Sequence, residues 1–443
     1  MARSLSSTIR LAGISALALG AAQPAFAQDA SDAAAAQEPE AGLDTIIVTA
    51  NRREENLQDV PVSAATLSAD AVQAVFAAGA EVTALAGRVP GLYVESSNGR
   101  AAPKFYIRGL GNTDFDLAAS QPVSVVMDDV VLENVSLKAF PIFDVERIEV
   151  LRGPQGTLFG RNTPAGIVKI DTVRPSDEFT FDAAASYGSY DSLSIDGGIG
   201  GPIVQDLVSF RASFLWQSRS DWVDNGYTGE ENVLGGFDDL AARFQLLLTP
   251  TENISVLGSI QYRSLEGSST LFRANILGPG NNDLNDNYDR DTVFYDAGGG
   301  NQANYEALIA SMKAEIDLGG VTLTSITARA TSEGSSRGDI DGGFGAAFLP
   351  EMGPGLIPFP ADSQDSIDLT QFTQEIRLAS DANQPFSWQI GGFYFESDFD
   401  VTTEGFDFPP PATVNHTNES WAVFGQANYQ LTDSARITAG LRY

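Results

Sequence analysis

The residues after Pro175 alternate between apolar and polar over long stretches, and this pattern constrains the fold more than any other feature. In "VSFRASFLWQ" one set of alternate positions is apolar, namely Val208, Phe210, Ala212, Phe214 and Trp216, and their neighbours are polar except Leu215. A period of two is typical of a strand with one buried face. Strands of soluble β-sandwiches have roughly 5–6 residues, whereas a tilted strand needs about 9–11 to cross a bilayer. The stretches here run to about ten, which favours strands that span a membrane.

The connections between these stretches alternate in length. We expect eleven strands, near residues 178–187, 192–200, 206–218, 240–249, 253–264, 306–317, 320–331, 368–379, 386–397, 419–431 and 434–443. On one side lie tight turns such as "PTE", "GG", "DANQPF" and "TD". On the other side lie the short loop 188–191 and long loops at 219–239, 265–305, 332–367 and 398–418. This asymmetry is typical of outer-membrane barrels, so the sequence predicts a transmembrane antiparallel β-barrel over residues 178–443 rather than a soluble sandwich.

The odd number of strands is informative in itself. Bacterial single-chain barrels have an even number, because both chain ends stay on the periplasmic side. An open sheet edge in lipid would also leave backbone groups unpaired. We therefore expect these strands to be part of a larger barrel, and the sequence to stop inside it.

The N-terminus has the composition of a secretory signal. Arg3 and Arg10 precede the apolar run "LAGISALALGAA", and "AFA" at residues 25–27 fits the small-x-small cleavage rule. The apolar run is shorter than the roughly 20 residues of a spanning helix. We expect a signal peptide over residues 1–27. A flexible tether over 28–55 should follow, because "QDASDAAAAQEPEAGL" has too few apolar residues to build a core.

The composition excludes several classes of function. The sequence has no Cys, which excludes thiol nucleophiles, disulfides and Cys-ligated zinc. A single His, His416, argues against a Ser-His-Asp triad and against His-rich metal sites. The formal net charge of −32 argues against a nucleic-acid partner, which requires a basic face. We expect no catalytic residue, no metal site and no cofactor. The Asp- and Asn-rich run "NNDLNDNYDRD", residues 281–291, is expected to be a solvated outer loop, and a calcium site there is the alternative.

Residues 56–177 have a mixed pattern. The segment "SADAVQAVFAAGAEVTALAGRVPGLYV" predicts one or two short helices that end at Gly- and Pro-rich turns. The segments "PVSVVMDDVVL" and "VERIEVLRG" predict short strands. We expect a compact α+β domain here.

Three motifs carry a resemblance to a known family. The run "VERIEVLRGPQGTLFGRNTPAGIVKIDTVRP", residues 145–175, resembles the plug motif of TonB-dependent outer-membrane receptors, and "FYIRGLG", residues 105–111, resembles another plug element. The run "DTIIVTA", residues 44–50, stands where the family has its TonB box. Departures are Ala165 and Asp129, each where Gly is more usual. The resemblance implies an α+β plug followed by a barrel of about 22 strands, of which about half are present.

The candidate box also has a physical reason of its own. It spans Asp44 to Ala50, and its β-branched residues are Thr45, Ile46, Ile47, Val48 and Thr49. After a flexible tether, such a run can add a strand to the sheet edge of a partner through main-chain hydrogen bonds. The resemblance implies that the partner is TonB, energised by the ExbB/ExbD complex. The alternative is that the run forms the first strand of the plug.

The resemblance further implies where the plug meets the barrel and the solute. Plug arginines of the family pair with barrel acids, so we expect Arg108 and Arg152 to pair with Glu375 of "TQEIRL", and Arg161 to make another plug–barrel contact. The solute is expected near two polar connections of the plug, residues 96–102 and 112–120. The candidate solute-binding residues are Arg100, Asn112, Asp114 and Phe115.

These features predict TonB-dependent active import of a scarce solute across the bacterial outer membrane, without enzymatic activity. We expect the solute to be a ferric siderophore. The alternatives are an oligosaccharide, cobalamin or an aromatic compound carried by the same mechanism, and a truncated receptor fragment that does not transport. Outer-membrane lipid and lipopolysaccharide would surround such a barrel. A passive porin or an adhesin would need neither box nor plug.

Overall fold

The computed structural model describes residues 47–49, 51–53, 55–76, 79–274, 276–278, 280–295, 301–342, 362–382, 384–405, 410–432 and 435–443. All of them belong to one unit of the chain, Ile46–Tyr443. The expected signal peptide, the first part of the tether, and Asp44, Thr45, Ile46 and Ala50 of the candidate box lie outside the described residues.

Five strands form the main sheet of the plug, in the order β3-β8-β9-β6-β7. Their bounds are Ser63–Ser68 (β3), Val145–Arg152 (β8), Gly166–Thr172 (β9), Val123–Met127 (β6) and Val130–Leu132 (β7). β6 and β9 are parallel, and the other pairs are antiparallel. β6 and β7 are buried along their whole length, as expected for nearly continuous apolar runs. The strands predicted in "PVSVVMDDVVL" and "VERIEVLRG" are confirmed.

Short helices and a hairpin complete the plug. They are α1 (Ala69–Phe76), α2 (Gly156–Phe159), the 3-10 turns η1 (Leu57–Asp59), η2 (Val82–Leu85) and η3 (Leu137–Ala139), and the hairpin of β4 (Leu92–Ser96) and β5 (Pro103–Ile107). α1 confirms the helix predicted in "SADAVQAVF" and buries Val72 and Phe76 in the plug core. No helix in the described ranges is both long and apolar enough to cross a membrane.

The β6–β7 hairpin turns on two aspartates. Asp128 has a φ of +47° and Asp129 a φ of +69°. Two-residue hairpin loops of type I′ need positive φ at both positions, and Asp tolerates this better than most residues. The carboxylate of Asp128 accepts hydrogen bonds from Thr172 N at 2.9 Å and Thr172 Oγ1 at 2.8 Å. Burial raises the pKa of Asp128.

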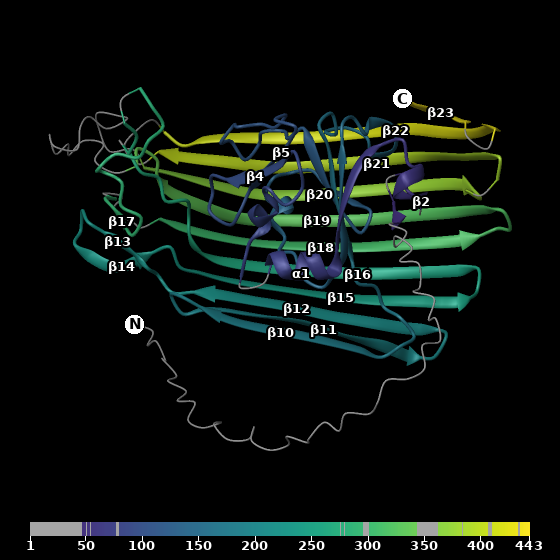
Figure 1. The fold of residues 1–443 in the computed structure, drawn as a ribbon, viewed down its shortest axis with the longest axis horizontal. Coiled ribbons are helices and arrows are strands. Elements are labelled where there is room, and N and C mark those ends of the chain that lie inside the picture. Colours follow the sequence, from purple (N-terminus) through teal and green to yellow (C-terminus); the bar gives the residue numbers. More distant parts are fainter. Residues whose placement is uncertain are drawn as a thin grey trace, which may run out of the picture. The chain divides into compact units, whose positions relative to one another are not determined.

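Eleven strands lie side by side in one antiparallel sheet, which Figure 1 shows from teal to yellow. They are β10 (Thr180–Gly188), β11 (Ser192–Val204), β12 (Val208–Arg219), β15 (Phe237–Thr251), β16 (Ile254–Ser268), β18 (Gln302–Asp317), β19 (Val321–Asp339), β20 (Asp362–Ser380), β21 (Phe386–Gly405), β22 (Ala412–Thr432) and β23 (Ala435–Arg442). The predicted number is confirmed. Several strands extend beyond the predicted bounds, because end segments such as "DSQDS" are polar on both faces and give no period-two signal.

Each strand turns alternate residues toward the plug and away from it. In β15, Ala241 and Arg243 are buried, whereas Leu240 and Phe244 are 43% and 45% exposed. The exposed face is apolar across the sheet, with Phe214, Trp216, Leu246, Ile260, Tyr262, Leu308, Met312, Ile376, Ile390, Trp421 and Val423 among its members. Such an extended exposed apolar face fits contact with lipid. Leu215, the exception to the alternation, packs inward with Phe143 and Ala241.

The connections differ at the two ends of the sheet, as predicted. Two residues join β15 to β16, and three join β18 to β19, where Gly319 and Gly320 have φ values of +82° and +88°. At the other end, loop residues form a small sheet of β13 (Val223–Asn225), β14 (Glu230–Leu234) and β17 (Thr292–Val293). These segments lie in the predicted loops 219–239 and 265–305, because strands this short show no periodicity in the sequence.

Candidate functional site

The C-terminal half of the candidate box is attached to the plug. Ile47–Val48 forms β1, which pairs with β2 (Glu55–Asn56) on one edge. In the described part of the chain, no other strand pairs with β1. Val48 is fully buried in a cluster that contains Val126, Leu151, Ile167 and Phe424. The alternative in which the run is the first strand of the plug therefore applies to Ile47–Val48 in this structure.

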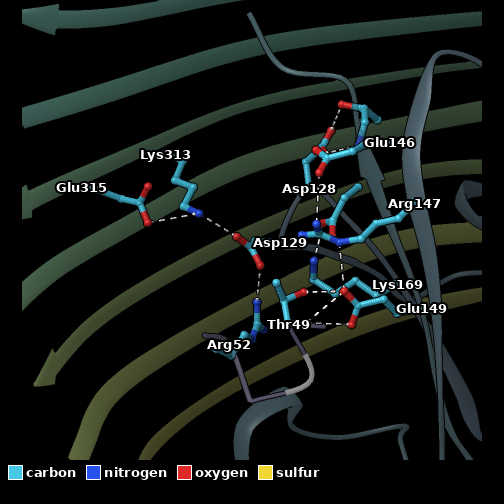
Figure 2. A network of polar contacts seen from close by, with 12 residues as sticks. Thr49, Arg52, Asp128, Asp129, Glu146, Arg147, Glu149, Lys169, Lys313 and Glu315 are labelled. Atoms are coloured by element: carbon cyan, nitrogen blue, oxygen red, sulfur yellow. Dashed lines mark hydrogen bonds and ion pairs between the residues drawn. The ribbon is translucent and has the colours of Figure 1, made fainter. Parts of the chain in front are cut away.

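Thr49 is bound to a buried carboxylate of the plug sheet (Figure 2). Its backbone N–H donates to both carboxylate oxygens of Glu149 at 3.0 Å, and its hydroxyl donates to one of them at 3.0 Å. Glu149 lies on β8 and is 0% exposed. Arg147 Nε donates to the same carboxylate at 3.1 Å and to Asp171 at 3.0 Å. A buried carboxylate needs several donors, and the end of the box supplies two of them.

The residues directly after the box contact the barrel. Arg52 is paired with Asp129 of the plug at 3.1 Å and with Glu375 of β20 at 3.4 Å. Its guanidinium also lies 4.3 Å from the ring centroid of Phe159. Asn51 O accepts a hydrogen bond from Gln389 Nε2 at 3.2 Å. The segment that follows the box thus joins the plug sheet to two barrel strands.

The predicted partners of Glu375 were wrong. Glu375 is buried and faces inward as expected, but its partners are Arg52 and Arg377. Arg152 donates to the carbonyl oxygens of Pro90 at 3.1 Å and Ala64 at 3.2 Å. Arg152 lies opposite Ser63 on the neighbouring strand β3, so its side chain stays within the plug.

Arg108 also stays within the plug. Its guanidinium donates to Ser63 Oγ at 3.2 Å, and its backbone has a φ of +53°. The sequence shows that an arginine is present, but it does not show which acid the fold brings near it.

Asp129 is a second junction between plug and barrel. Its carboxylate pairs with Arg52 and with Lys313 of β18, whose Nζ lies 3.0 Å from Asp129 Oδ2. The same Nζ lies 3.2 Å from Glu315 Oε1. Burial acts to raise the pKa of Asp129, but Lys313 and Arg52 outweigh it and hold the pKa well below the usual range. Figure 2 shows this carboxylate between the two cations. The Asp at this position, where Gly is common in the resembled family, therefore adds a buried ionic link.

Arg161 makes the plug–barrel contact predicted for it. It donates to Asn418 Oδ1 on β22 at 2.7 Å, and its guanidinium lies 4.8 Å from the ring centroid of Phe395 on β21. Within the plug it pairs with Glu133.

On β12, β15 and β16 the charges are reversed, because the barrel supplies arginines and the plug supplies acceptors. Arg211 Nε donates to Asp144 Oδ2 at 2.9 Å, and Arg243 donates to the Asp144 carbonyl at 2.7 Å. Burial acts to raise the pKa of Asp144, but the hydrogen bonds from Arg211 and Ser213 outweigh it and lower the pKa. Sequence reasoning missed these residues as a site. The available signal was an arginine on the plug-facing side of adjacent strands, since a buried guanidinium needs an acceptor.

The four candidate solute-binding residues divide into two groups. Arg100 is mostly buried: it donates to Gln217 at 2.7 Å and pairs with Asp239 at 3.5 Å, both on the barrel. Asn112, Asp114 and Phe115 lie in an exposed loop of the plug. Asn112 and Asp114 each accept a backbone N–H two residues further along. Phe115 is 61% exposed, with Lys104 Nζ 4.5 Å from its ring centroid. The structure does not bring Arg100 together with the other three.

Comparisons with known proteins agree with this architecture. Residues 56–167 match the model of the TonB-dependent Receptor Plug Domain. The chain is 26% identical over 266 residues to the vitamin B12 transporter BtuB of Vibrio vulnificus (strain CMCP6), covering 52% of this chain and 41% of that protein. It is 30% identical over 213 residues to the pesticin receptor of Yersinia pestis, covering 47% of this chain and 30% of that protein.

A similar fold is found among solved structures. The ferric yersiniabactin uptake receptor FyuA from Yersinia pestis superposes with a TM-score of 0.71 at 19% identity, covering 86% of this chain and 56% of that one. The ferripyoverdine receptor FpvA of P. aeruginosa, in complex with a heterologous pyoverdine, gives a TM-score of 0.71 at 13% identity, covering 89% and 53%. The chain spans less than half the length of the curated relatives given above.

Proposed function

We propose that this chain, which belongs to the TonB-dependent receptors of the bacterial outer membrane, takes part in the active import of a scarce solute, with TonB as the partner that delivers energy. The observation that carries the proposal is the attachment of Ile47–Thr49. This segment is bound to the plug sheet through Glu149, and the next residues are bound to the barrel through Arg52. A pull on this segment would therefore put force on both the plug sheet and the barrel.

The proposed division of the chain has four parts. We propose a signal peptide over 1–27, a tether with the TonB box over 28–55, a plug over 56–177 and barrel strands over 178–443. The start of β10 at Thr180 and the plug match over 56–167 support the last two boundaries.

The box would bind TonB by strand addition. Among the described strands β1 pairs only with β2, so an incoming strand could pair with its other edge once Val48 and Thr49 leave the plug. Asp44–Ala50 would be the contact, and the ExbB/ExbD complex would energise TonB. Force applied there would first break the bonds of Thr49 to Glu149 and then the ion pairs of Arg52.

A ferric siderophore is the solute that we propose first. One relative is a vitamin B12 transporter, and two structural neighbours are receptors for ferric yersiniabactin and ferripyoverdine. Cobalamin is therefore the alternative with direct support. The exposed loop with Asn112, Asp114 and Phe115 is the proposed contact for the solute. The lipid-facing side of the sheet would contact outer-membrane lipid and lipopolysaccharide. We propose no catalytic role for any residue.

The test is a Val48→Pro substitution in the receptor expressed in its host. Proline removes the N–H of Val48 from the ladder, so uptake of the solute should be lost while solute binding to intact cells is retained. Val48→Ile is the matched control, because it keeps both the N–H and the apolar burial. Uptake by Val48→Pro at the level of the control would overturn the proposal.

A further inference from the structure

A polar hollow lies at the end of the barrel sheet that carries the long loops. Its volume is about 680 Å³. Its lining includes Asn232 of β14, Glu266 of β16, and Gln302 and Asn304 of β18. Leu265 and Ala303, the neighbours of Glu266 and Asn304, pack in the plug core. Because side chains alternate along a strand, Glu266 and Asn304 point away from the plug, to the lipid-facing side of the sheet. We call this space the rim hollow.

The small loop sheet forms one wall of the rim hollow. β14 contributes Leu234 to this wall, and Leu234 also packs with Val223 and Val293 in a hydrophobic core of the loops. The next residue, Gly235, has a φ of +89°, and its N–H donates to Ser268 Oγ at 2.8 Å. This wall is therefore held in place by packing and by a hydrogen bond to the end of β16.

Three side chains in the rim hollow are free to bind a ligand. Glu266, Gln302 and Asn304 are exposed, and within the residues that the structure describes their side chains make no hydrogen bond or ion pair. The strand register places Glu266 opposite Asn304, and Ser268 opposite Gln302, so these groups lie close together. A carboxylate accepts hydrogen bonds, and an amide both donates and accepts them. This combination matches the neighbouring hydroxyl groups of a sugar.

The rim hollow borders the apolar band of the barrel. Tyr262 lies on the same face of β16 as Glu266 and is 37% exposed. On β12, Trp216 is 36% exposed, and its indole N–H donates to Asp238 Oδ2 at 3.0 Å. Asp238 stands opposite Glu266 in the sheet. Exposed Trp and Tyr residues at the edge of an apolar band mark the level of the lipid headgroups. The rim hollow is therefore level with the headgroups of the outer leaflet.

The charges around the rim hollow disfavour an anionic headgroup. Asp221 and Glu266 line it, and Asp238 lies beside Glu266 on the same face. Arg219 also lines it, but its Nε donates to Ser192 Oγ at 3.0 Å and its guanidinium lies 5.2 Å from the ring centroid of Phe237. A phosphate in this space would meet more carboxylates than free cations, whereas an uncharged sugar would meet only hydrogen-bonding partners.

We propose that the rim hollow binds the uncharged sugar headgroup of an outer-leaflet glycolipid, whose acyl chains lie on the apolar face below it. Glu266 accepts hydrogen bonds from the sugar hydroxyls, and the amides of Gln302 and Asn304 complete the contact. Leu240, Tyr262 and Leu308 belong to the exposed apolar face on which the chains would rest. The site is on the outside of the barrel, so it is separate from the imported solute and from TonB.

The test uses the purified receptor in lauryldimethylamine oxide, a detergent without a sugar headgroup. The probe is monoglucosyl diacylglycerol, and phosphatidylglycerol with the same acyl chains is the anionic comparison. Native mass spectrometry over a titration gives the affinity for each lipid. We expect the glucosyl lipid to bind about tenfold more tightly, the factor that corresponds to roughly one or two hydrogen bonds. Methyl glucoside, which has no acyl chains, should not displace the lipid at equal concentration.

Matched variants locate the binding. The double variant Glu266→Ala, Asn304→Ala should lose the preference for the glucosyl lipid. Glu333→Ala is the control, because Glu333 is exposed on the same face, opposite Glu306, but does not line the rim hollow. All three positions are exposed, so these variants should fold.

Three results would overturn the proposal. The wild type would bind phosphatidylglycerol as tightly as the glucosyl lipid, the double variant would keep the preference, or methyl glucoside would displace the lipid at equal concentration. The last result would make the rim hollow a site for soluble sugars. None of these measurements requires TonB, so they are independent of the uptake result for Val48→Pro.

Discussion

The backbone N–H of Thr49 donates to both carboxylate oxygens of Glu149 at 3.0 Å, and this contact joins the end of the proposed TonB box to a fully buried position of the plug sheet. Thr49 and Glu149 are 100 residues apart in sequence. The contact makes the accessibility of the box depend on one side chain of β8, and it can be tested directly.

Glu149→Gln should release the end of the box. The substitution removes the charge that strengthens the two bonds from Thr49, and bonds to charged groups contribute roughly 1.5–3 kcal/mol each to stability. We expect faster proteolysis near Thr49 and tighter binding of a TonB fragment by about tenfold or more. Limited proteolysis and titration with the fragment measure both effects. Glu146→Gln is the control, because Glu146 also contacts Arg147 but is exposed and has no bond to Thr49. Equal behaviour of the two variants would contradict the role of Glu149.

The parts of the fold that repeat could be predicted from the sequence, and the pairwise contacts could not. Period-two alternation and turn length located all eleven barrel strands, because each strand carries its own signal. The partner of Glu375 carried no such signal. It depends on where the fold brings Arg52, a residue 323 positions away. Burial of Val48 was likewise hidden, since a strand of two residues has no periodicity.

Asp129 should show two opposing effects on the plug. Asp129→Ala removes the carboxylate between Arg52 and Lys313, and breaking a buried ion pair costs about 3–5 kcal/mol, less here because each cation keeps a second acid. Asp129→Gly removes the same carboxylate but also relieves the φ of +69°, which is worth about 1–2 kcal/mol. We therefore expect the wild type to be the most stable, Asp129→Gly to be less stable, and Asp129→Ala to be the least stable. Denaturant unfolding of the plug measures this order. If Asp129→Gly is no more stable than Asp129→Ala, the positive φ at residue 129 does not strain the backbone.

Lys138 should make the stability of the plug rise with pH. Burial lowers its pKa to about 8, with Glu133 opposing, and Nζ donates to the Val123 carbonyl at 2.9 Å. An unfolded lysine has a pKa of about 10.4, so between these values the unfolded chain binds more protons and stability increases with pH. Below about pH 8 Lys138 is protonated in both the folded and the unfolded state, and the buried charge destabilises the folded state by its full amount.

Lys138→Met should therefore stabilise the plug at pH 7. The gain has an upper limit of roughly 3 kcal/mol, reduced by the lost bond to Val123. By pH 10 the wild type should have recovered most of the difference. Thermal unfolding at both pH values measures this, and a difference between the two proteins that does not change with pH would show that the lysine is not destabilised by its charge.

Arg100 and Phe115 should respond differently to truncation, although the sequence suggested one role for both. Arg100→Ala removes bonds to Gln217 and Asp239, while Asp239 keeps its pair with Arg263 at 2.8 Å. We expect a loss of about 1–3 kcal/mol in plug stability. Phe115→Ala changes an exposed side chain, so stability should stay within about 0.5 kcal/mol while solute binding falls. Denaturant unfolding and solute binding to intact cells separate the two effects. If Phe115→Ala binds solute as the wild type does, the exposed loop is not the contact for the solute.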